Sequence, residues 1–283
     1  MDKFLFELVG PHYDLSRGEI KAVLDSLDFN YKILSEPEGL LFIESDMNPN
    51  LIGKRLGLIH RIYSDSIRTT EEDIVNINTG IQIPKGDAAV KTRRIKGKEA
   101  DTKDIKIKLG KELSKEHDIN LNDPDHIVYV FVTDDIYLGR KIFETDKDSF
   151  KQREVKERPH FSPISLKPRL ARALVNLTRP SPGERLHDPF CGTGGILLEA
   201  DFIDLVVSGG DISEEMTQGC LQNLEEFNVK GEVIQGDISD TIPENIDCIV
   251  TDPPYGRSSS TSGEDVESIY ERLFKTSRDR LKE

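Results

Sequence analysis

From residue 161 onward, short apolar runs alternate with longer segments of helical pattern, and this rhythm constrains the fold more than any other feature of the chain. The apolar runs have the length of buried strands, and the segments between them carry apolar residues at helical spacing. Helices are expected at 167–177, 195–204, 214–228 and 266–282. Such an alternation predicts a parallel sheet whose faces are covered by the helices.

An acidic residue stands at or just after the end of each predicted strand. The four motifs are "DPFCGTGG" (188–195), "GGDIS" (209–213), "GDISD" (236–240) and "TDPPYG" (251–256). Because open α/β sheets bind ligands at the carboxyl ends of their strands, we expect the four acids to line one site. The combination fits S-adenosylmethionine. It fits NAD less well, since the sequence has neither the G-x-G-x-x-G pattern nor an evident phosphate-cradling loop.

Each motif taken singly has a structural alternative. The glycines of "CGTGG" let the backbone approach a ligand closely, or they form only a tight β–α turn. Asp211 can accept both hydrogen bonds of a ribose diol, or else Asp211 or Ser213 caps the next helix. Asp237 can accept a hydrogen bond from an adenine amino group, or it is a capping or turn residue. Cys191 is expected to be a small packing residue rather than a nucleophile.

Two smaller zones of alternating strands and helices precede this part of the chain. In residues 1 to about 80, strands are expected at 4–10 and 39–45, and helices at 16–27 and from 48 onward. In residues 81–145, a helix is expected at about 101–117, followed by two strands around an Asp-Asp turn within 127–142. The polar residues 143–160 are expected to form a linker. These zones predict small α+β modules.

The formal charge of −14 argues against a uniformly basic nucleic-acid binder, but the charge is unevenly distributed. Residues 91–115 hold ten Lys or Arg against four Asp or Glu, whereas residues 173–283 hold nine against twenty-two. The basic stretch either faces an anionic polymer or is a solvated helix face. Three cysteines without paired spacing argue against a disulfide framework or a zinc site and fit a reducing cytoplasm.

The four motifs together resemble those of the class I S-adenosylmethionine-dependent methyltransferases that modify exocyclic amino groups of nucleobases. With "RPHFSPISLKPRLARALVNL" (158–177) leading into them, the chain is most similar to the archaeal tRNA guanine-10 N2-methyltransferases. The resemblance implies a Rossmann-like α/β methyltransferase domain, expected to be C-terminally incomplete, preceded by α+β ferredoxin-like and THUMP modules. The implied domains are a ferredoxin-like module (1–50), a THUMP RNA-binding domain (51–145), a linker (146–160) and the methyltransferase domain (161–283).

The resemblance also implies roles for individual residues. Asp188 and Gly192, with Gly194 nearby, would line the methionine part of S-adenosylmethionine, Asp211 would hold the ribose, and Asp237 with the backbone near Ile238 would read the adenine. Phe190 and Ile212 complete the expected cofactor-binding set. Residues 160–174 would close over the methionine end, with His160 in a linker or capping role rather than as a base. Arg169 and Arg172 either meet phosphate or are exposed helix charges.

The "DPPY" corner would bind the target base. The exocyclic amine of guanine is a poor nucleophile because its lone pair is delocalised into the ring, so it needs positioned acceptors rather than a strong base. The expected catalytic residues are Asp252, which supplies a carboxylate, Pro253, which supplies a backbone carbonyl, and Pro254, which stiffens the corner with it. Tyr255 offers a face on which an extruded base can stack, and Gly256 leaves room for it. No metal is required.

The expected partner is tRNA, bound through Arg93, Arg94, Lys96 and Lys98 in the basic stretch. The chain is expected to be a monomer in the cytoplasm, without a membrane span, and a small activator subunit is compatible with the resemblance. Two other functions stay open at this point. One is an adenine-N6 or cytosine-N4 nucleic-acid methyltransferase, because "DPPY" chemistry is shared among all three. The other is an RNA-binding module with an inactive, truncated catalytic domain.

Overall fold

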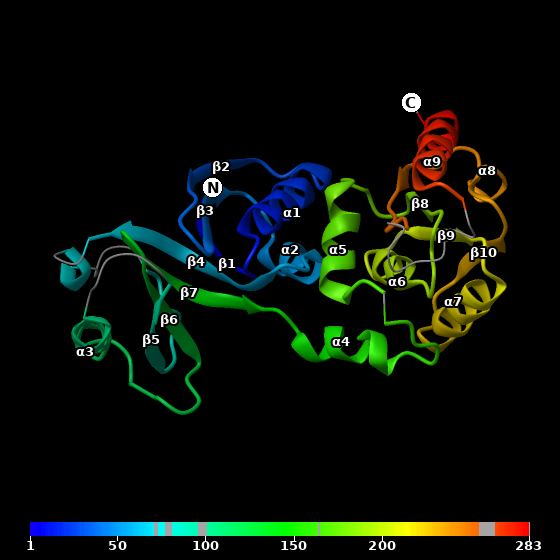
Figure 1. Cartoon of the computed structure of the whole chain (residues 1–283). Helices are drawn as coiled ribbons and strands as arrows, with labels where there is room; N and C mark the ends of the chain where they lie inside the picture. Colours follow the sequence, from blue (N-terminus) through cyan, green and yellow to red (C-terminus); the bar gives the residue numbers. More distant parts are fainter. Residues whose placement is uncertain (71–72, 77–80, 96–100, 164, 255–263, 283) are drawn as a thin grey trace. The chain divides into compact units, whose positions relative to one another are not determined.

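The computed structural model describes residues 1–70, 73–76, 81–95, 101–163, 165–254 and 264–282. The chain divides into two compact units, Met1–Thr145 and Asp146–Glu283 (Figure 1). Each unit has its own sheet and its own buried core.

Unit 1 is built on a seven-stranded mixed sheet in the order β2-β3-β1-β4-β7-β6-β5. Its strands are β1 (Asp2–Leu8), β2 (Tyr31–Ser35), β3 (Leu40–Ser45), β4 (Ile59–Thr69), β5 (Ala88–Arg94), β6 (His126–Val132) and β7 (Ile136–Glu144). Its helices are α1 (Tyr13–Ser26), α2 (Pro49–Arg55), the 3-10 turn η1 (Asp73–Asn76) and α3 (Thr102–Leu113). All pairings are antiparallel except that of β5 with β6, which is parallel.

The sheet of unit 1 is covered by helices on one face, and it curves so that its other face is concave. Alternate residues of β1 pack in the cluster that includes α1 and α2, and alternate residues of β6 pack with α3. The opposite face buries an aromatic cluster that includes Tyr63, Phe131 and Tyr137. There Glu7 of the interior strand β1 pairs with Arg93 of the edge strand β5. Since three strands separate β1 from β5 in the sheet order, this pair requires a strongly curved sheet.

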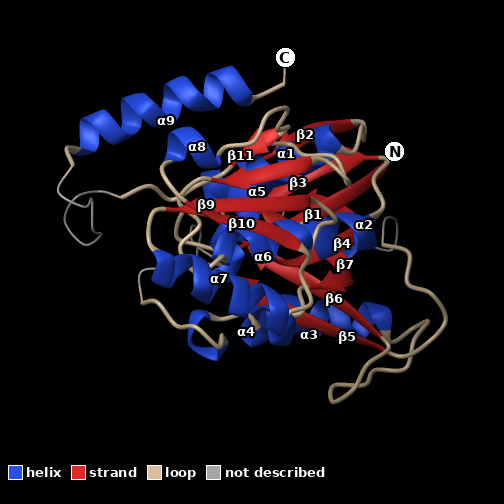
Figure 2. Cartoon of the chain, turned by 90° about the vertical axis from the view of Figure 1, so that its right-hand side faces the viewer, coloured by secondary structure: helices blue, strands red, loops and turns tan. Residues whose placement is uncertain are grey.

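Unit 2 is built on a four-stranded parallel sheet in the order β10-β9-β8-β11. Its strands are β8 (Arg185–Asp188), β9 (Val206–Asp211), β10 (Gly231–Gln235) and β11 (Cys248–Ile249). Its helices are α4 (Lys147–Gln152), the 3-10 turn η2 (Val155–Glu157), α5 (Pro168–Leu177), α6 (Gly195–Asp201), α7 (Glu214–Glu226), α8 (Ile238–Thr241) and α9 (Val266–Arg280). The Rossmann-like α/β architecture predicted for this part of the chain is confirmed (Figure 2).

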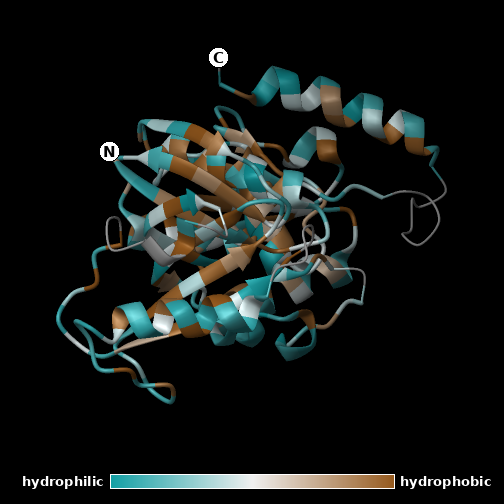
Figure 3. Ribbon diagram, turned by 90° about the vertical axis from the view of Figure 1, so that its left-hand side faces the viewer, coloured by the Kyte–Doolittle hydropathy of each residue, from teal (hydrophilic) through white to brown (hydrophobic). Residues whose placement is uncertain are grey.

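Two apolar clusters flank the sheet of unit 2. The larger one joins α5, α6 and α7 to the inward residues of the sheet, among them Leu186 and Val207. The smaller one joins α8 and α9 through Ile238, Ile242 and Leu273. In Figure 3, α9, which lies next to the C-terminus, shows alternating polar and apolar bands. This banding matches a helix that buries one face only, with Ile269 and Leu273 inward.

Two segments of unit 2 differ from a simple reading of the sequence. Residues 146–160, expected as a linker, form α4 and η2, and they bury Phe150 as well as Arg153 and Arg158. After α9 the chain returns to the sheet, where Leu281 forms a parallel bridge with Ile246 next to β11. Within the described residues, no helix is both long and apolar enough to cross a membrane.

Candidate active site

The carboxyl ends of the four parallel strands carry the four acids that the sequence singled out. Asp188 ends β8 and Asp211 ends β9, while Asp237 follows β10 and Asp252 follows β11. Because the strands are parallel, all four residues lie along the carboxyl ends of the strands of unit 2. We call this row of four acids the acidic edge. The expected gathering of acids at this edge is therefore what the topology produces.

Asp188 is the most buried of these acids, with 1% of its surface exposed. Its Oδ1 accepts hydrogen bonds from Thr251 Oγ1 at 2.6 Å and from the Phe190 backbone N–H at 3.1 Å. Burial raises the pKa of Asp188 to about 7, against the lowering effect of these two donors. The nearby charges of Asp211 and Asp252 add to the rise. Near neutral pH, the Asp188 carboxyl is therefore present in both its charged and its neutral form.

The glycine turn after β8 is shaped by two residues with positive φ. Gly192 has φ +48°, and a Cβ there would meet no atom within 4 Å, so this side of the turn is open. Gly194 has φ +82°, and a Cβ there would come within 2.7 Å of Cys220 Sγ. The first glycine thus leaves room for a ligand, whereas the second permits close packing against α7.

Asp211 links the glycine turn to the start of α7. Its Oδ2 accepts a hydrogen bond from the Gly192 N–H at 3.0 Å, and its Oδ1 accepts one from the Ser213 N–H at 2.9 Å. Burial raises the pKa of Asp211, and the backbone donors oppose that rise. Ser213 is the N-cap of α7, so the capping role belongs to Ser213. The neighbouring Ile212 is 56% exposed and presents an apolar surface beside the carboxylate.

Asp237 caps the short helix α8 and also contacts α9. Its Oδ1 accepts from the Ser239 N–H at 2.9 Å, and its Oδ2 lies 3.2 Å from Arg272 Nη2. Burial raises the pKa of Asp237, but hydrogen bonds from Ser239 and the charge of Arg272 lower it by more, so the net shift is downward. Next to it, Ile238 is buried in a cluster against which Phe190 packs. Asp237 is therefore a charged acceptor at neutral pH.

The proline corner follows β11. Asp252, Pro253 and Pro254 are each partly exposed, and the Tyr270 hydroxyl of α9 donates to the Pro254 carbonyl at 3.4 Å. The expected stacking residue Tyr255 and the neighbouring Gly256 lie outside the described residues. Asp252 directly follows Thr251, whose hydroxyl bonds Asp188, and the charge of Asp252 contributes to the raised pKa of Asp188.

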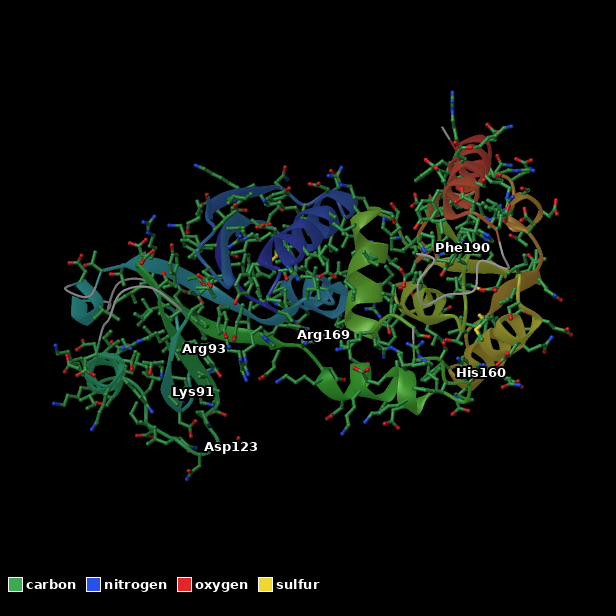
Figure 4. The ribbon with its side chains drawn as sticks, viewed as in Figure 1. Lys91, Arg93, Asp123, His160, Arg169 and Phe190 are labelled. Carbon is green, nitrogen blue, oxygen red and sulfur yellow. The ribbon has the colours of Figure 1, made fainter. Side chains whose placement is uncertain are left out.

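The segment upstream of α5 is tied to the glycine turn. Ser165 Oγ lies 2.8 Å from Thr193 Oγ1. Asn223 of α7 donates through Nδ2 to the Thr193 carbonyl at 2.9 Å and to the His160 carbonyl at 3.1 Å, and accepts from the His160 N–H at 2.8 Å. The His160 ring packs where a Cβ of Gly219 would stand (His160 is labelled in Figure 4). His160 is thus fixed by packing and backbone contacts.

Arg172 corrects one expectation. It is neither a phosphate ligand nor an exposed charge, because it is fully buried and its Nη2 lies 2.6 Å from Glu199 Oε2. Arg153 holds the other oxygen of Glu199, with Nε 2.7 Å from Oε1. Both guanidinium groups also lie over the Phe202 ring. The reason for the error is that Glu199 comes from another helix, α6, which local sequence cannot reveal.

Cys191 is a packing residue, as expected. It is 5% exposed and lies in the main core cluster of unit 2 beside Cys220. The hydrogen bond with Cys220 and burial both raise the pKa of the Cys191 thiol. A thiol of this kind stays protonated and is a poor nucleophile. Within the described part of the chain, no group of three or more His, Cys, Asp or Glu side chains is arranged to hold a metal ion.

The expected RNA-binding residues lie in unit 1, in and after β5. Arg93 and Arg94 end that strand, while Lys96 and Lys98 lie outside the described residues. Arg93 keeps 50% of its side chain exposed and pairs with the buried Glu7, which also accepts from the Tyr63 hydroxyl at 2.6 Å. Lys91, two residues earlier on the same strand, is exposed (Figure 4). Sequence reasoning did not single out Lys91, although its spacing from Arg93 places both on one face.

Several residues of the site escaped sequence reasoning. Thr251 bonds Asp188 from the neighbouring strand end, and Asn223 ties the upstream segment to the glycine turn. Tyr270 and Arg272 reach the site from α9. Only Thr251 carried a signal, since it directly precedes Asp252 at the end of the strand that pairs with β8. The others depend on contacts between elements far apart in the chain.

Comparisons with known proteins give one consistent result. A family model described as "RMKL-like, methyltransferase domain" matches residues 156–283. The tRNA (guanine(10)-N2)-dimethyltransferase of Methanothermobacter thermautotrophicus is 32% identical, over 96% of this chain and 83% of that protein. The protein of the same name from Pyrococcus abyssi is 33% identical, over 96% of this chain and 84% of that protein.

Solved structures share the fold. TrmN from Thermus thermophilus superposes with a TM-score of 0.57 at 21% identity, over 99% of this chain and 86% of that one. SMU.472, crystallised in complex with SAH, has a TM-score of 0.53 at 15% identity, over 99% of this chain and 88% of that one.

Proposed function

Because the chain belongs to the tRNA (guanine(10)-N2)-dimethyltransferase family, we propose that it transfers methyl groups from S-adenosylmethionine to the exocyclic N2 of guanine in tRNA. The observation that carries this proposal is the match at 32–33% identity over more than four fifths of the relatives' length. The relatives' name points to guanine-10 as the target. The acidic edge of unit 2, with the "DPPY" corner beside it, supplies the chemistry that such a transfer needs.

The cofactor residues we propose are Asp188, Phe190, Gly192, Gly194, Asp211, Ile212, Asp237 and Ile238. The edge of the sheet fits S-adenosylmethionine, since Gly192 leaves open space at the turn and the exposed Ile212 offers an apolar surface for a flat ring. Asp211 accepts backbone hydrogen bonds through both oxygens and is only half-buried, so its carboxylate can also accept from a ribose diol. When bound, the cofactor supplies an electrophilic methyl group on a sulfonium.

The catalytic residues we propose are Asp252, Pro253, Pro254 and Tyr255. The Asp252 carboxylate and the Pro253 carbonyl accept hydrogen bonds from the guanine amine, which orients the nitrogen lone pair toward the methyl group. As the new N–C bond forms, the nitrogen becomes more acidic, and Asp252 takes the proton that it releases. Tyr255 stacks on the base. The Tyr270 hydrogen bond to Pro254 supports a fixed corner.

For tRNA binding we propose unit 1, with residues 1–50 as a ferredoxin-like module and 51–145 as a THUMP domain. The supporting observation is the concentration of ten Lys or Arg in residues 91–115 of an otherwise acidic chain. Arg93, Arg94, Lys96 and Lys98 are the proposed phosphate contacts. Arg93 also holds the buried Glu7, so its neutralisation would perturb the fold of unit 1.

The RNA contacts are best tested without touching Arg93. Changing Lys91, Arg94, Lys96 and Lys98 to Gln should weaken tRNA binding and reduce its log–log salt slope by up to about 0.7–0.9 per lost phosphate contact. Cofactor affinity should stay unchanged. Lys275→Gln with Arg278→Gln, exposed on α9, is the control. Unchanged tRNA affinity and salt slope would show that the basic stretch is only solvated.

The proposed activity is tested by incubating the purified chain with S-adenosylmethionine and tRNA transcripts, followed by mass spectrometry of the nucleosides. We expect N2-methylguanosine or its dimethyl form. N6-methyladenosine or N4-methylcytidine would favour the alternative nucleobase targets, and no product despite cofactor binding would contradict the proposal for the chain alone. A requirement for a small activator subunit would then appear as activity restored by cell extract.

The expected monomer is checked by light scattering. A cytoplasmic location is supported by three buried free cysteines.

A further inference from the structure

Helix α9 contacts the candidate site at two points that sequence reasoning did not anticipate. Arg272 pairs with Asp237, the proposed adenine acceptor, at 3.2 Å. Tyr270 donates to the carbonyl of Pro254, in the proposed base-binding corner, at 3.4 Å. Asp237 follows β10 and Pro254 follows β11, and these are the two outermost strands of the four-stranded sheet. One helix therefore reaches both halves of the site.

The packing of α9 fixes where these two side chains stand. Ile269 and Leu273 are buried, and Leu273 packs with Ile238 and Ile242 of the α8 segment. Figures 1 and 2 show α9 beside α8. Because Ile238 directly follows Asp237, the apolar contact holds α9 next to the carboxylate that Arg272 meets. The buried apolar contact between α9 and the α8 segment thus positions Arg272 for its ion pair with Asp237.

Arg272 is itself held in place. Its Nη1 and Nη2 donate to the two oxygens of Glu264 at 2.7 Å each, a bidentate geometry that restricts the guanidinium plane. Glu264 precedes α9, so the clamp forms within one short stretch of chain. The guanidinium then presents Nη2 to Asp237 Oδ2 from a fixed direction.

The contact with Arg272 leaves Asp237 able to bind a ligand. Asp237 Oδ1 accepts from the Ser239 N–H and Oδ2 meets Arg272, yet the Asp237 side chain keeps 35% of its surface exposed, so the carboxylate is accessible to a ligand. With both oxygens held from the protein side, the exposed part of the carboxylate faces a defined direction. Such an acceptor loses less rotational freedom when it takes a hydrogen bond from an amino group.

We propose that α9 positions both halves of the site, with Arg272 orienting the Asp237 carboxylate toward the adenine amino group of the cofactor and Tyr270 holding the Pro254 carbonyl of the base-binding corner. The inference rests on the proposed function, because it uses the same cofactor and base. Arg272 and Tyr270 are positioning residues, since each acts through another residue of the site.

The Arg272 role is tested by calorimetric titration of the full chain with S-adenosylhomocysteine. Arg272→Met should weaken binding about three- to five-fold, as fits a partly exposed ion pair. Arg278→Met, an exposed arginine of the same helix, should leave affinity unchanged. Arg272→Lys keeps the charge but loses the bidentate clamp and should fall between wild type and Arg272→Met. Unchanged affinity in Arg272→Met would overturn the proposal.

A double-variant cycle separates positioning from a general effect on the fold. If Arg272 acts through Asp237, adding Arg272→Met to Asp237→Asn should cost no further affinity. The analogue S-inosylhomocysteine, which has an oxygen in place of the adenine amino group, should bind wild type and Arg272→Met equally. Losses that add in the double variant, or that are the same for both ligands, would contradict a role through Asp237.

The Tyr270 role is tested by single-turnover methyl transfer to tRNA at saturating S-adenosylmethionine. Tyr270→Phe removes only the hydroxyl, and the rate should fall about two- to ten-fold, while S-adenosylhomocysteine affinity stays unchanged. An unchanged rate, or equal losses of rate and affinity, would overturn this half of the proposal. If wild type binds cofactor and methylates tRNA while the variants match it, only this inference fails. If wild type does neither, the proposed function itself fails.

Discussion

Replacing Asp188 by Asn should make the stability of unit 2 less dependent on pH. The carboxyl is 1% exposed, and burial raises its pKa to about 7 from an ordinary value of 3.8. A group whose pKa is raised in the folded state stabilises fully below its unfolded pKa, and this contribution is lost as pH rises through the folded pKa. The rise of the Asp188 pKa from 3.8 to about 7 corresponds to roughly 4 kcal/mol in the free energy of unfolding, most of it lost between about pH 4 and 7.

Asparagine keeps the geometry of this site, because its Oδ1 can still accept from Thr251 and from the Phe190 N–H. The difference in unfolding free energy between Asp188→Asn and wild type should therefore grow by about 1.4 kcal/mol per pH unit from pH 5 to 7 and then level off. Asp279→Asn, which removes the same charge from an exposed position on α9, is the control.

The assay is urea denaturation without cofactor at a series of pH values. The transition of unit 2 is identified as the one that added S-adenosylmethionine shifts to higher urea. A stability difference between Asp188→Asn and wild type that does not change between pH 5 and 8 would refute the account of a buried carboxyl with a raised pKa. A pH dependence equal to that of Asp279→Asn would refute it as well.

Three further predictions concern single residues. Asp252→Ala should lower the rate of methyl transfer at least about 100-fold, on the order of 3 kcal/mol, because a positioned acceptor is lost. S-adenosylmethionine affinity, measured by calorimetry, should stay near normal. Equal losses of rate and affinity would contradict the assignment of Asp252 to the base. Asp211→Ala should weaken S-adenosylmethionine binding by about 1–3 kcal/mol through the loss of a charge-assisted acceptor, and unchanged calorimetric affinity would remove it from the cofactor site. Glu199→Gln should lower the free energy of unfolding by about 3–5 kcal/mol, since Arg153 and Arg172 would lose their buried counter-charge. Urea denaturation with the exposed Glu215→Gln as control checks this, and a change no larger than in the control would contradict it.

The acidic edge could be predicted because its signals are local. Each of Asp188, Asp211, Asp237 and Asp252 follows an apolar run, and the strand–helix alternation alone implies that such runs are parallel and end together. Helices α5, α6, α7 and α9 were predicted for the same reason, since apolar residues at helical spacing need a buried face wherever the helix packs. The short helices α4 and α8 were not predicted. What the sequence could not supply was the orientation of each carboxylate.

Elements with weak or interrupted patterns were missed in unit 1. β4 was not predicted because its ladder is irregular, with register shifts between Ile62 and Tyr63 and between Ser64 and Ile67, and with Asp65 at positive φ. β5 begins with apolar residues but ends with basic residues that suggested an RNA surface. Because these charges interrupt the apolar run, β5 was not predicted as a strand. β2 is short and only partly buried, which gives almost no alternating pattern.

Contacts between distant elements account for the remaining differences. Arg172 was read as an exposed or phosphate-binding charge because its partner Glu199 lies in another helix. Arg272 and Tyr270 gave no signal either, since their roles depend on how α9 packs against α8. A charged or aromatic residue on a helix acquires its role from tertiary packing, and sequence spacing does not report that packing.

The most direct test of the central claim compares two tRNA transcripts that differ at one functional group. One carries guanosine at position 10 and the other carries inosine there, which lacks the exocyclic N2 amine but keeps the rest of the base. With S-adenosylmethionine and the purified chain, we predict methyl incorporation into the guanosine transcript and none into the inosine transcript, read by mass spectrometry of the digested RNA. Equal incorporation into both transcripts would contradict methyl transfer to N2 of guanine-10.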